Sequence, residues 1–257
     1  MRMIINSDDF GATISVNDHT LDLIERGRIS SATLIANAPA LEDAIRRIPR
    51  HTRCSFGVHL NLTEFAPLTP PEELNDLKPF LDGRGSFAGE AVLRSVPIDA
   101  RARDAFFKEW CLQVKRVLSL GLSVSHFDSH NHVHTMPTLF QVLKRVQREF
   151  GIRKVRTSWN VYSASSPPSS ALLLKKQLWN LALRYYYPTV TTSAFTSFAV
   201  FYELAKHQRR SEFIQYDSME LMVHPGHPDF EEETQLLKSD WQREFGIQAQ
   251  LISYWDL

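Results

Sequence analysis

Residues 3–36 read MIINSDDFGATISVNDHTLDLIERGRISSATLIA, and this stretch decides the fold. Its short apolar runs are separated by a segment with apolar side chains at helical spacing, the pattern of a β-strand, an α-helix and a second strand. The three predicted elements are residues 3–8, 15–26 and 31–36. Such a unit is typical of folds built on a parallel sheet.

The same alternation continues to the end of the chain. Further strands are predicted at residues 54–62, 124–129, 154–157 and 219–224, and further helices at residues 40–48, 99–120, 136–150, 172–185 and 230–245. Pro and Gly cluster in residues 67–97, and Ser and Pro in residues 163–170, so both are predicted as inserted loops. Residues 186–202 show no clear period. We expect one α/β domain over residues 1–257, an irregular TIM-like barrel of about six or seven βα units.

Bulk composition excludes several classes of protein. Hydrophobic residues make up 43% of the chain, and 29 Lys and Arg balance 29 Asp and Glu, so net charge favours neither nucleic acid nor an anionic membrane. Cys54 and Cys111 are too few for a disulfide framework and are expected to stay reduced. The apolar run at the N-terminus is too short for a signal peptide, and no run is long enough to span a membrane. A cytoplasmic location is the simplest expectation.

Two polar clusters stand at the ends of early strands. Asp8 and Asp9 follow the first strand, where one carboxylate could bind a cation while the other faces a substrate; the alternative is that they cap the next helix. His59 interrupts an apolar strand, with Asn61 and Thr63 following on the same face. A buried imidazole needs a partner, so His59 is either functional or a hydrogen-bonded core residue.

The richest cluster is residues 125–134, SHFDSHNHVH. It holds four of the ten histidines of the chain together with Asp128. We expect the strand to end near His130, with the later histidines on the turn into the next helix. Imidazole and carboxylate together suit zinc, manganese, iron or nickel. The alternative is a solvated histidine loop without a ligand.

A last histidine, His224, ends the late strand and is followed by Pro225 and Gly226, which force a turn. Taken together, the clusters predict a divalent cation held by a carboxylate and two imidazoles. Such an ion lowers the pKa of water and polarises a carbonyl, while a second carboxylate takes a proton and a further histidine protonates a leaving amine. The pattern therefore predicts hydrolysis of an amide or ester.

Four motifs also resemble those of the YdjC-like carbohydrate deacetylases, a family that includes chitooligosaccharide deacetylases and hopanoid-biosynthesis-associated proteins. They are residues 6–11 (NSDDFG), 57–63 (GVHLNLT), 126–134 and 224–226 (HPG), in the order of the family. The resemblance implies an irregular (β/α) barrel that binds one divalent metal, magnesium or zinc. It also implies an N-acetylated saccharide as substrate and, as a family-level expectation, a homodimer.

The resemblance further implies roles for individual residues. The metal ligands would be Asp9, His59 and His130. Asp8 would be the general base, by analogy with the Asp-Asp pair of other polysaccharide deacetylases, and His224 the acid or the oxyanion stabiliser. We expect Asp128, His134 and Asn61 to orient a ligand or line the site rather than bind the metal, since ligating histidines need such partners.

Other functions remain open at this point. A phosphoesterase would need several metals, and an amidohydrolase often needs a carbamylated lysine, although no lysine lies in the strand-end clusters. A sugar-binding protein that has lost catalysis would bind saccharides without turnover. The sequence names neither the sugar nor the metal.

Overall fold

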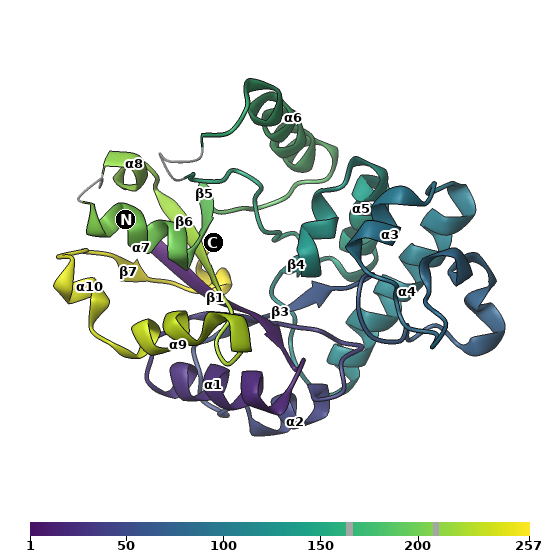
Figure 1. Cartoon of the computed structure of the whole chain (residues 1–257), viewed down its shortest axis with the longest axis horizontal. Coiled ribbons are helices and arrows are strands. Elements are labelled where there is room, and N and C mark those ends of the chain that lie inside the picture. Colours follow the sequence, from purple (N-terminus) through teal and green to yellow (C-terminus); the bar gives the residue numbers. More distant parts are fainter. Residues whose placement is uncertain (163–166, 208–210) are drawn as a thin grey trace.

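The strands that the structure describes all run parallel in one curled sheet (Figure 1). The computed structural model describes residues 1–162, 167–207 and 211–257. Within these residues the strand order is β4-β3-β2-β1-β6-β5, with β7 paired to the start of β1. The strands are β1 Arg2–Phe10, β2 Ser31–Leu34, β3 Ser55–Leu60, β4 Phe127–Ser129, β5 Ala194–Ser197, β6 Ser218–Val223 and β7 Gln250–Leu251.

Helices follow the strands and cover the outside of the sheet (Figure 1). In the described ranges they are α1 Ile14–Glu25, α2 Leu41–Arg47, α3 Glu90–Ser95, α4 Ala100–Ser119, α5 Phe140–Phe150, α6 Ser170–Tyr186, α7 Phe198–Lys206, α8 Ser211–Ile214, α9 Glu231–Lys238 and α10 Trp241–Glu244. N-terminal caps fix where three of these helices begin. The side chains of Thr13, Asp99 and Ser169 accept hydrogen bonds from backbone N–H groups in the first turns of α1, α4 and α6. The predicted α/β class is confirmed.

An irregular segment joins the two edge strands. Phe127 of β4 donates its N–H to Lys154 and accepts one from Arg156, both at 3.0 Å. Farther along, Phe195 of β5 exchanges backbone hydrogen bonds of 2.9 Å with Trp159 and Val161. Residues 154–157, which were predicted as a strand, therefore form isolated β-bridges and no regular strand. The segment pairs with β4 at one residue and then leaves it to reach β5. These bridges curl the sheet toward a closed barrel.

Other segments refine the expectations. Residues 67–97 hold short helices, the 3₁₀ turns Pro71–Asp76 and Lys78–Phe80 and then α3. Residues 186–202 supply β5 and the start of α7. Of the loop predicted at 163–170, residues 163–166 lie outside the described residues. No helix among the described parts is long and apolar enough to cross a membrane.

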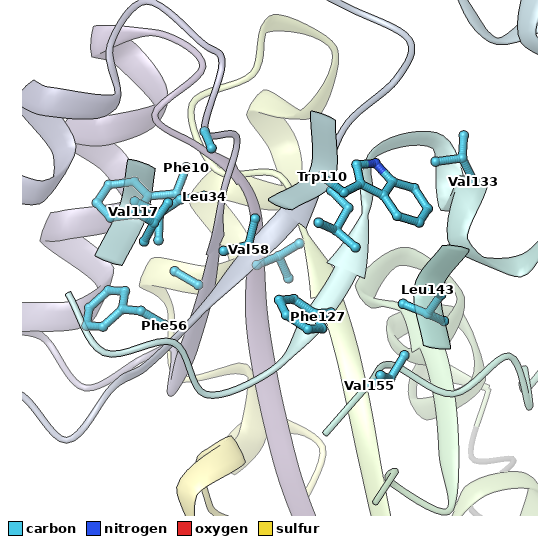
Figure 2. Close-up of a cluster of buried hydrophobic side chains, with 14 of the residues drawn as sticks. Phe10, Leu34, Phe56, Val58, Trp110, Val117, Phe127, Val133, Leu143 and Val155 are labelled. Carbon is cyan, nitrogen blue, oxygen red and sulfur yellow. The ribbon is translucent and has the colours of Figure 1, made fainter. Parts of the chain in front are cut away.

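The apolar core lies between the sheet and the surrounding helices. Figure 2 shows part of it, where Phe56, Val58 and Phe127 of the strands lie with Trp110 and Val117 of α4. Cys54 and Cys111 belong to this core as free thiols. Because side chains alternate along a strand, the opposite face is left for other residues, and there the barrel is polar. This polar interior positions the site.

Candidate active site

The carboxyl ends of β1, β3 and β4 bring together three of the polar clusters predicted from sequence. Asp9 Oδ1 lies 2.8 Å from His130 Nδ1 and 3.3 Å from His59 Nε2. Asp8 Oδ2 lies 3.9 Å from the same His59 nitrogen. Residues more than 100 positions apart thus converge because parallel strands end at the same edge of the sheet.

Asp9, His59 and His130 form a set of potential metal ligands. One ligand atom from each lies within 4.8 Å of the others. His59 Nδ1 is 2.7 Å from Asp128 Oδ1, a contact that leaves Nε2 facing Asp9. A carboxylate behind a histidine is the usual way in which proteins orient a metal-binding imidazole. One carboxylate and two imidazoles leave room for water and a substrate oxygen around a divalent ion.

The two imidazoles are held in an unusual state of protonation. Burial alone lowers the pKa of His59, but Asp128 and Asp8 raise it to about 10. Burial also lowers the pKa of His130, and hydrogen bonds to Asp9 and Glu64 raise it to about 9. Two positive charges therefore stand where a divalent cation would bring the same charge. The donor set fits such an ion in charge as well as in chemistry.

Arg156 is the centre of a buried ionic network. Its guanidinium donates to Asp8 Oδ1 and Oδ2 at 2.6 and 2.8 Å, lies 2.8 Å from Asp128, and donates to Glu220 at 2.8 Å. Burial raises the pKa of Asp8, but Arg156 outweighs burial and holds it well below the usual range. Burial raises the pKa of Glu220 to about 7 against the effect of Arg156, so a proton can stay there near neutral pH.

The same network gives a charge argument for a dication. When ionised, Asp8, Asp9 and Asp128 carry three negative charges, and Arg156 supplies one positive charge. Two negative charges remain in a buried region, and unpaired buried charge is costly. A divalent ion with neutral imidazoles, or two imidazolium groups, removes this deficit.

A second potential ligand set, Asp8, His59 and Asp128, is less suited to a metal. Asp8 and Asp128 both already contact the guanidinium of Arg156. The arginine thus occupies the cation position between them. Of the two sets among the described residues, Asp9, His59 and His130 is therefore the better suited to a metal.

Strained backbone surrounds the ligands. Four non-glycine residues in the described ranges have positive φ: Asp9 (61°), Phe65 (61°), Asn131 (52°) and His132 (52°). One is itself a candidate ligand, two follow His130 directly, and Phe65 follows the Glu64 that contacts His130. Left-handed backbone is unfavourable for such residues and persists where the surroundings impose it, often at functional sites.

His224 follows β6 directly and lies near enough to Asp8 and Asp9 for both carboxylates to affect its pKa. Its backbone N–H donates to Glu233 Oε1 at 2.6 Å, and its ring stacks on Phe230 at 4.5 Å. Gly226 has a φ of +76°, and a Cβ there would lie 2.5 Å from Ser15 O, so the turn after His224 needs glycine. Burial lowers the pKa of His224, while Asp8 and Asp9 oppose the shift. The ring is therefore neutral near pH 7.

The remaining predicted residues lie around this centre. Asn61 stabilises the loop that follows it, because its side chain donates to Glu64 O at 2.7 Å and accepts from the backbone N–H of Thr63 and Glu64.

His134 is buried, with Nδ1 2.6 Å from Ser129 Oγ, and lies outside both potential ligand sets. His126 lies deeper, stacked on Tyr254 at 3.5 Å.

Three residues of the site were not predicted from the sequence. Arg156 and Glu220 sit inside predicted strands, and a charged residue within an apolar strand is the signal that could have identified Glu220, whereas Lys154 beside Arg156 hid any such signal. Glu64, with Oε1 3.2 Å from His130 Nε2, follows the polar strand end at Thr63. Its acidic side chain beside the histidine motif was the available signal.

A cavity of about 210 Å³ adjoins the network through His132 and Arg156. Trp179 of α6 and Phe195 of β5 supply aromatic surface to its wall, and Asn160 supplies a polar group. Aromatic faces and a few polar groups are common features of small-molecule sites. The cavity is a space beside His132 and Arg156 into which a small substrate could extend, although Asp9, His59 and His130 do not line it.

Comparison with known proteins places these features in a family. The sequence profile of the YdjC-like proteins matches residues 2–250. A carbohydrate deacetylase of Geobacillus stearothermophilus is 37% identical over 159 residues, which cover 60% of this chain and 60% of that protein. A carbohydrate deacetylase of Brevibacillus brevis is 25% identical over 231 residues, covering 89% of this chain and 83% of the other. The matches to the first three similar relatives span 60%, 68% and 57% of their lengths.

Solved structures support the fold. A proposed cellobiose-phosphate cleavage protein of Enterococcus faecalis superposes with a TM-score of 0.76 at 22% identity, covering 99% of this chain and 98% of the other. A lactam utilization protein of Thermus thermophilus gives a TM-score of 0.54 at 12% identity, with coverage of 98% and 100%. At these identities the likeness concerns the architecture alone.

Proposed function

Because this chain belongs to the YdjC-like protein family, we propose that it is a metal-dependent hydrolase that removes acetyl groups from an N-acetylated sugar. The observation that carries the proposal is the convergence of Asp9, His59 and His130 beside a second, separately held carboxylate, Asp8. The naming of similar relatives as carbohydrate deacetylases supports the same reaction.

In this proposal Asp9, His59 and His130 hold one divalent ion. When bound, the ion supplies Lewis acidity, which lowers the pKa of a water molecule and polarises the acetyl carbonyl. Magnesium and zinc both remain candidates, although two imidazoles favour the softer ion. Asp128 positions His59 through Nδ1, and Glu64 positions His130.

Asp8 is proposed to take the proton of the attacking water. Arg156 and Asn6 fix the orientation of its carboxylate, with Asn6 Nδ2 donating to Oδ1 at 2.8 Å. Its low pKa makes Asp8 a weak base, because a carboxylate stabilised by a guanidinium has less tendency to accept a proton. The proton can therefore be passed on readily to the leaving amine.

His224 is proposed to stabilise the developing oxyanion through its N–H, or to protonate the amine with a proton that Asp8 has first passed to it. A neutral imidazole keeps one N–H to donate, and its lowered pKa keeps it neutral near pH 7. The turn at Gly226 and the bond to Glu233 hold its backbone in place. The adjoining cavity, with Trp179 and Phe195 on its wall, is the proposed position of the sugar.

The testing experiment measures acetate release from N,N′-diacetylchitobiose and a panel of N-acetylated sugars. Purified protein is assayed before and after chelation, with zinc, magnesium or other divalent ions added back. We expect activity that disappears with the chelator and returns with metal. Acetate release that is indifferent to the chelator, or no release from any sugar by protein that holds one metal, contradicts the proposal.

Variants separate the roles. His59→Ala and His130→Ala should lose bound metal and activity together, whereas Asp8→Asn should keep metal and lose turnover. His51→Ala, at an exposed histidine, is the matched control and should keep both. If Asp8→Asn remains active while Asp9→Asn does not, the division of roles within the acidic pair is wrong.

A further inference from the structure

Helix α6 has an apolar stripe that is exposed to solvent, and the part of it at Leu181 and Tyr185 also borders a hollow beside Trp159. Trp179 and Leu183 are buried against the fold. On the other side, Leu174, Leu178, Leu181 and Tyr185 are 57%, 59%, 54% and 81% exposed. Their spacing of four, three and four residues places them on one face of the helix. Such a helix is apolar on two faces, of which the fold uses one.

The position of α6 leaves this stripe accessible. The helix lies at the edge of the molecule, separated from the sheet that carries the site (Figure 1). Single exposed leucines are common on protein surfaces, but a row of them on one helix indicates an interaction surface. The stripe therefore indicates binding to a partner that has an apolar component.

The charges on α6 indicate the chemistry of that partner. Its 17 residues contain no Asp or Glu but include Lys175, Lys176 and Arg184. At about 100° per residue, Lys175 and Arg184 fall on opposite sides of the stripe, each roughly 90° from its centre. Lys176 instead turns inward and donates to Asn160. Two cations thus flank the apolar surface, although the whole chain has a net charge of zero.

Aromatic and basic groups also gather at the end of the helix. Tyr185 and Tyr186 are both exposed, and the guanidinium of Arg148 from α5 lies 5.1 Å from the ring centre of Tyr186. Tyrosine and arginine are suited to the boundary between water and lipid because each combines an apolar body with a polar end.

We propose that α6 is an interfacial helix that binds an anionic lipid surface. An apolar stripe with flanking cations and no acidic residue is the pattern of helices that lie in the membrane interface. A second copy of the chain fits less well, because α6 packed on α6 would bring two sets of cations together without a carboxylate from either helix. The flanking cations match phosphate headgroups, and the leucines match the acyl boundary.

Binding at this surface would also place the site close to the lipid. Leu172, Lys176 and Trp179 of α6 line the 210 Å³ cavity beside Arg156. Lys175, one of the two cations beside the stripe, also lines this cavity, so the face that binds lipid borders the cavity wall on the same helix. The lipid interaction does not depend on the reaction at the site, so it can be tested without any substrate.

The test is flotation of the full chain with vesicles of phosphatidylcholine alone or mixed in equal parts with phosphatidylglycerol. We expect binding to the mixed vesicles, much weaker binding to phosphatidylcholine, and loss of binding at high salt. The double variant Leu174→Ser/Leu178→Ser should weaken the partition about 100-fold, or about tenfold per leucine removed from the interface. Both positions lie outside the site and the cavity wall.

The matched control is Leu118→Ser/Leu120→Ser, at leucines that are 41% and 37% exposed near the end of α4. This control should bind vesicles as the unaltered chain does, and all three proteins should unfold at the same temperature. Absence of binding to mixed vesicles overturns the proposal, and so does equal loss in both double variants. A dimer in solution that Leu174→Ser/Leu178→Ser dissociates, without vesicle binding, would assign the stripe to a second copy instead.

Discussion

Replacing Arg156 with methionine tests whether one guanidinium holds the interior of the barrel together. The Arg156 side chain is 1% exposed and contacts Asp8, Asp128 and Glu220 at 2.6–2.8 Å. Methionine keeps much of the volume but removes the charge, so several carboxylates lose their counter-ion in a buried site. Breaking a buried ion pair by removing one partner costs about 3–5 kcal/mol. A domain is stable by about 5–15 kcal/mol, so this loss is a large fraction of the total.

The loss should depend on pH in a defined direction. In the unaltered protein Arg156 holds the pKa of Asp8 below its unfolded value, so ionised Asp8 contributes stability above the unfolded pKa of about 3.9. This contribution disappears as the pH falls through the folded pKa. Without Arg156, burial raises the pKa of Asp8, and the variant becomes less stable as the pH rises past the unfolded value. The difference in free energy of unfolding should therefore be larger at about pH 8 than at about pH 4.5.

Urea unfolding, followed by tryptophan fluorescence in the presence of a chelator, measures this difference. Arg156→Lys should be intermediate, because an ammonium cannot reach three carboxylates as a planar guanidinium does. Arg145→Met is the control. It removes the ion pair between Arg145, which is 42% exposed, and Asp104 on the surface, and exposed ion pairs contribute little to the free energy of unfolding. An Arg156→Met protein as stable as the unaltered chain at about pH 8, or a difference that does not change with pH, would refute the argument.

Three further predictions concern the same region. Asp128→Asn should weaken metal affinity about 10- to 100-fold, because the carboxylate that orients His59 is lost. Metal titration measures the affinity, and an unchanged affinity would show that Asp128 does not orient His59. Metal binding should release nearly two protons near neutral pH and fewer as the pH rises toward 10, because the pKa values of His59 and His130 are raised to about 10 and about 9. Calorimetry in buffers of different ionisation enthalpy counts the released protons. A measurement that finds no release would contradict the raised pKa values. Gly57→Ala should destabilise the fold by about 1–3 kcal/mol in thermal unfolding, because a Cβ there would lie 2.6 Å from a ring carbon of a buried histidine, whereas Gly83→Ala, with open space around it, should not. Equal effects of the two alanine substitutions would contradict the last prediction.

The sequence was sufficient to predict the repeating units and the edge of the sheet where polar residues gather. The apolar spacing around α1 and α4 and the short runs at β1 and β6 are local patterns, and the structure confirms those elements within a few residues. Parallel strands all point their carboxyl ends to one side, so polar residues that follow them must meet there. For this reason the polar clusters at Asp8 and Asp9, at His59 and at residues 126–134 could be expected at one edge, whereas the choice of Asp9, His59 and His130 as ligands came from the resemblance to the YdjC-like family.

Spacing alone could not assign the histidines of residues 126–134. The ring of His126 stacks on Tyr254, a residue near the other end of the chain, and His130 turns toward Asp9. The positive φ values of Asn131 and His132 end the alternation of side chains that a continuous strand would have kept. The turn, rather than the strand period, determines which imidazole reaches the acidic pair.

What the sequence by itself determined is therefore the α/β pattern, the strand-end positions of the polar residues and the chemical types of the candidate ligands. Only the tertiary structure decided which charges are paired, with Arg156 joining Asp8 across 148 positions of sequence and Glu220 across 64. It also decided that residues 154–161 close the sheet by single bridges and that α6 exposes a second apolar face. The physical reason is that hydrophobic period and turn chemistry act over a few residues, whereas the pairing of buried charges depends on which strands become neighbours.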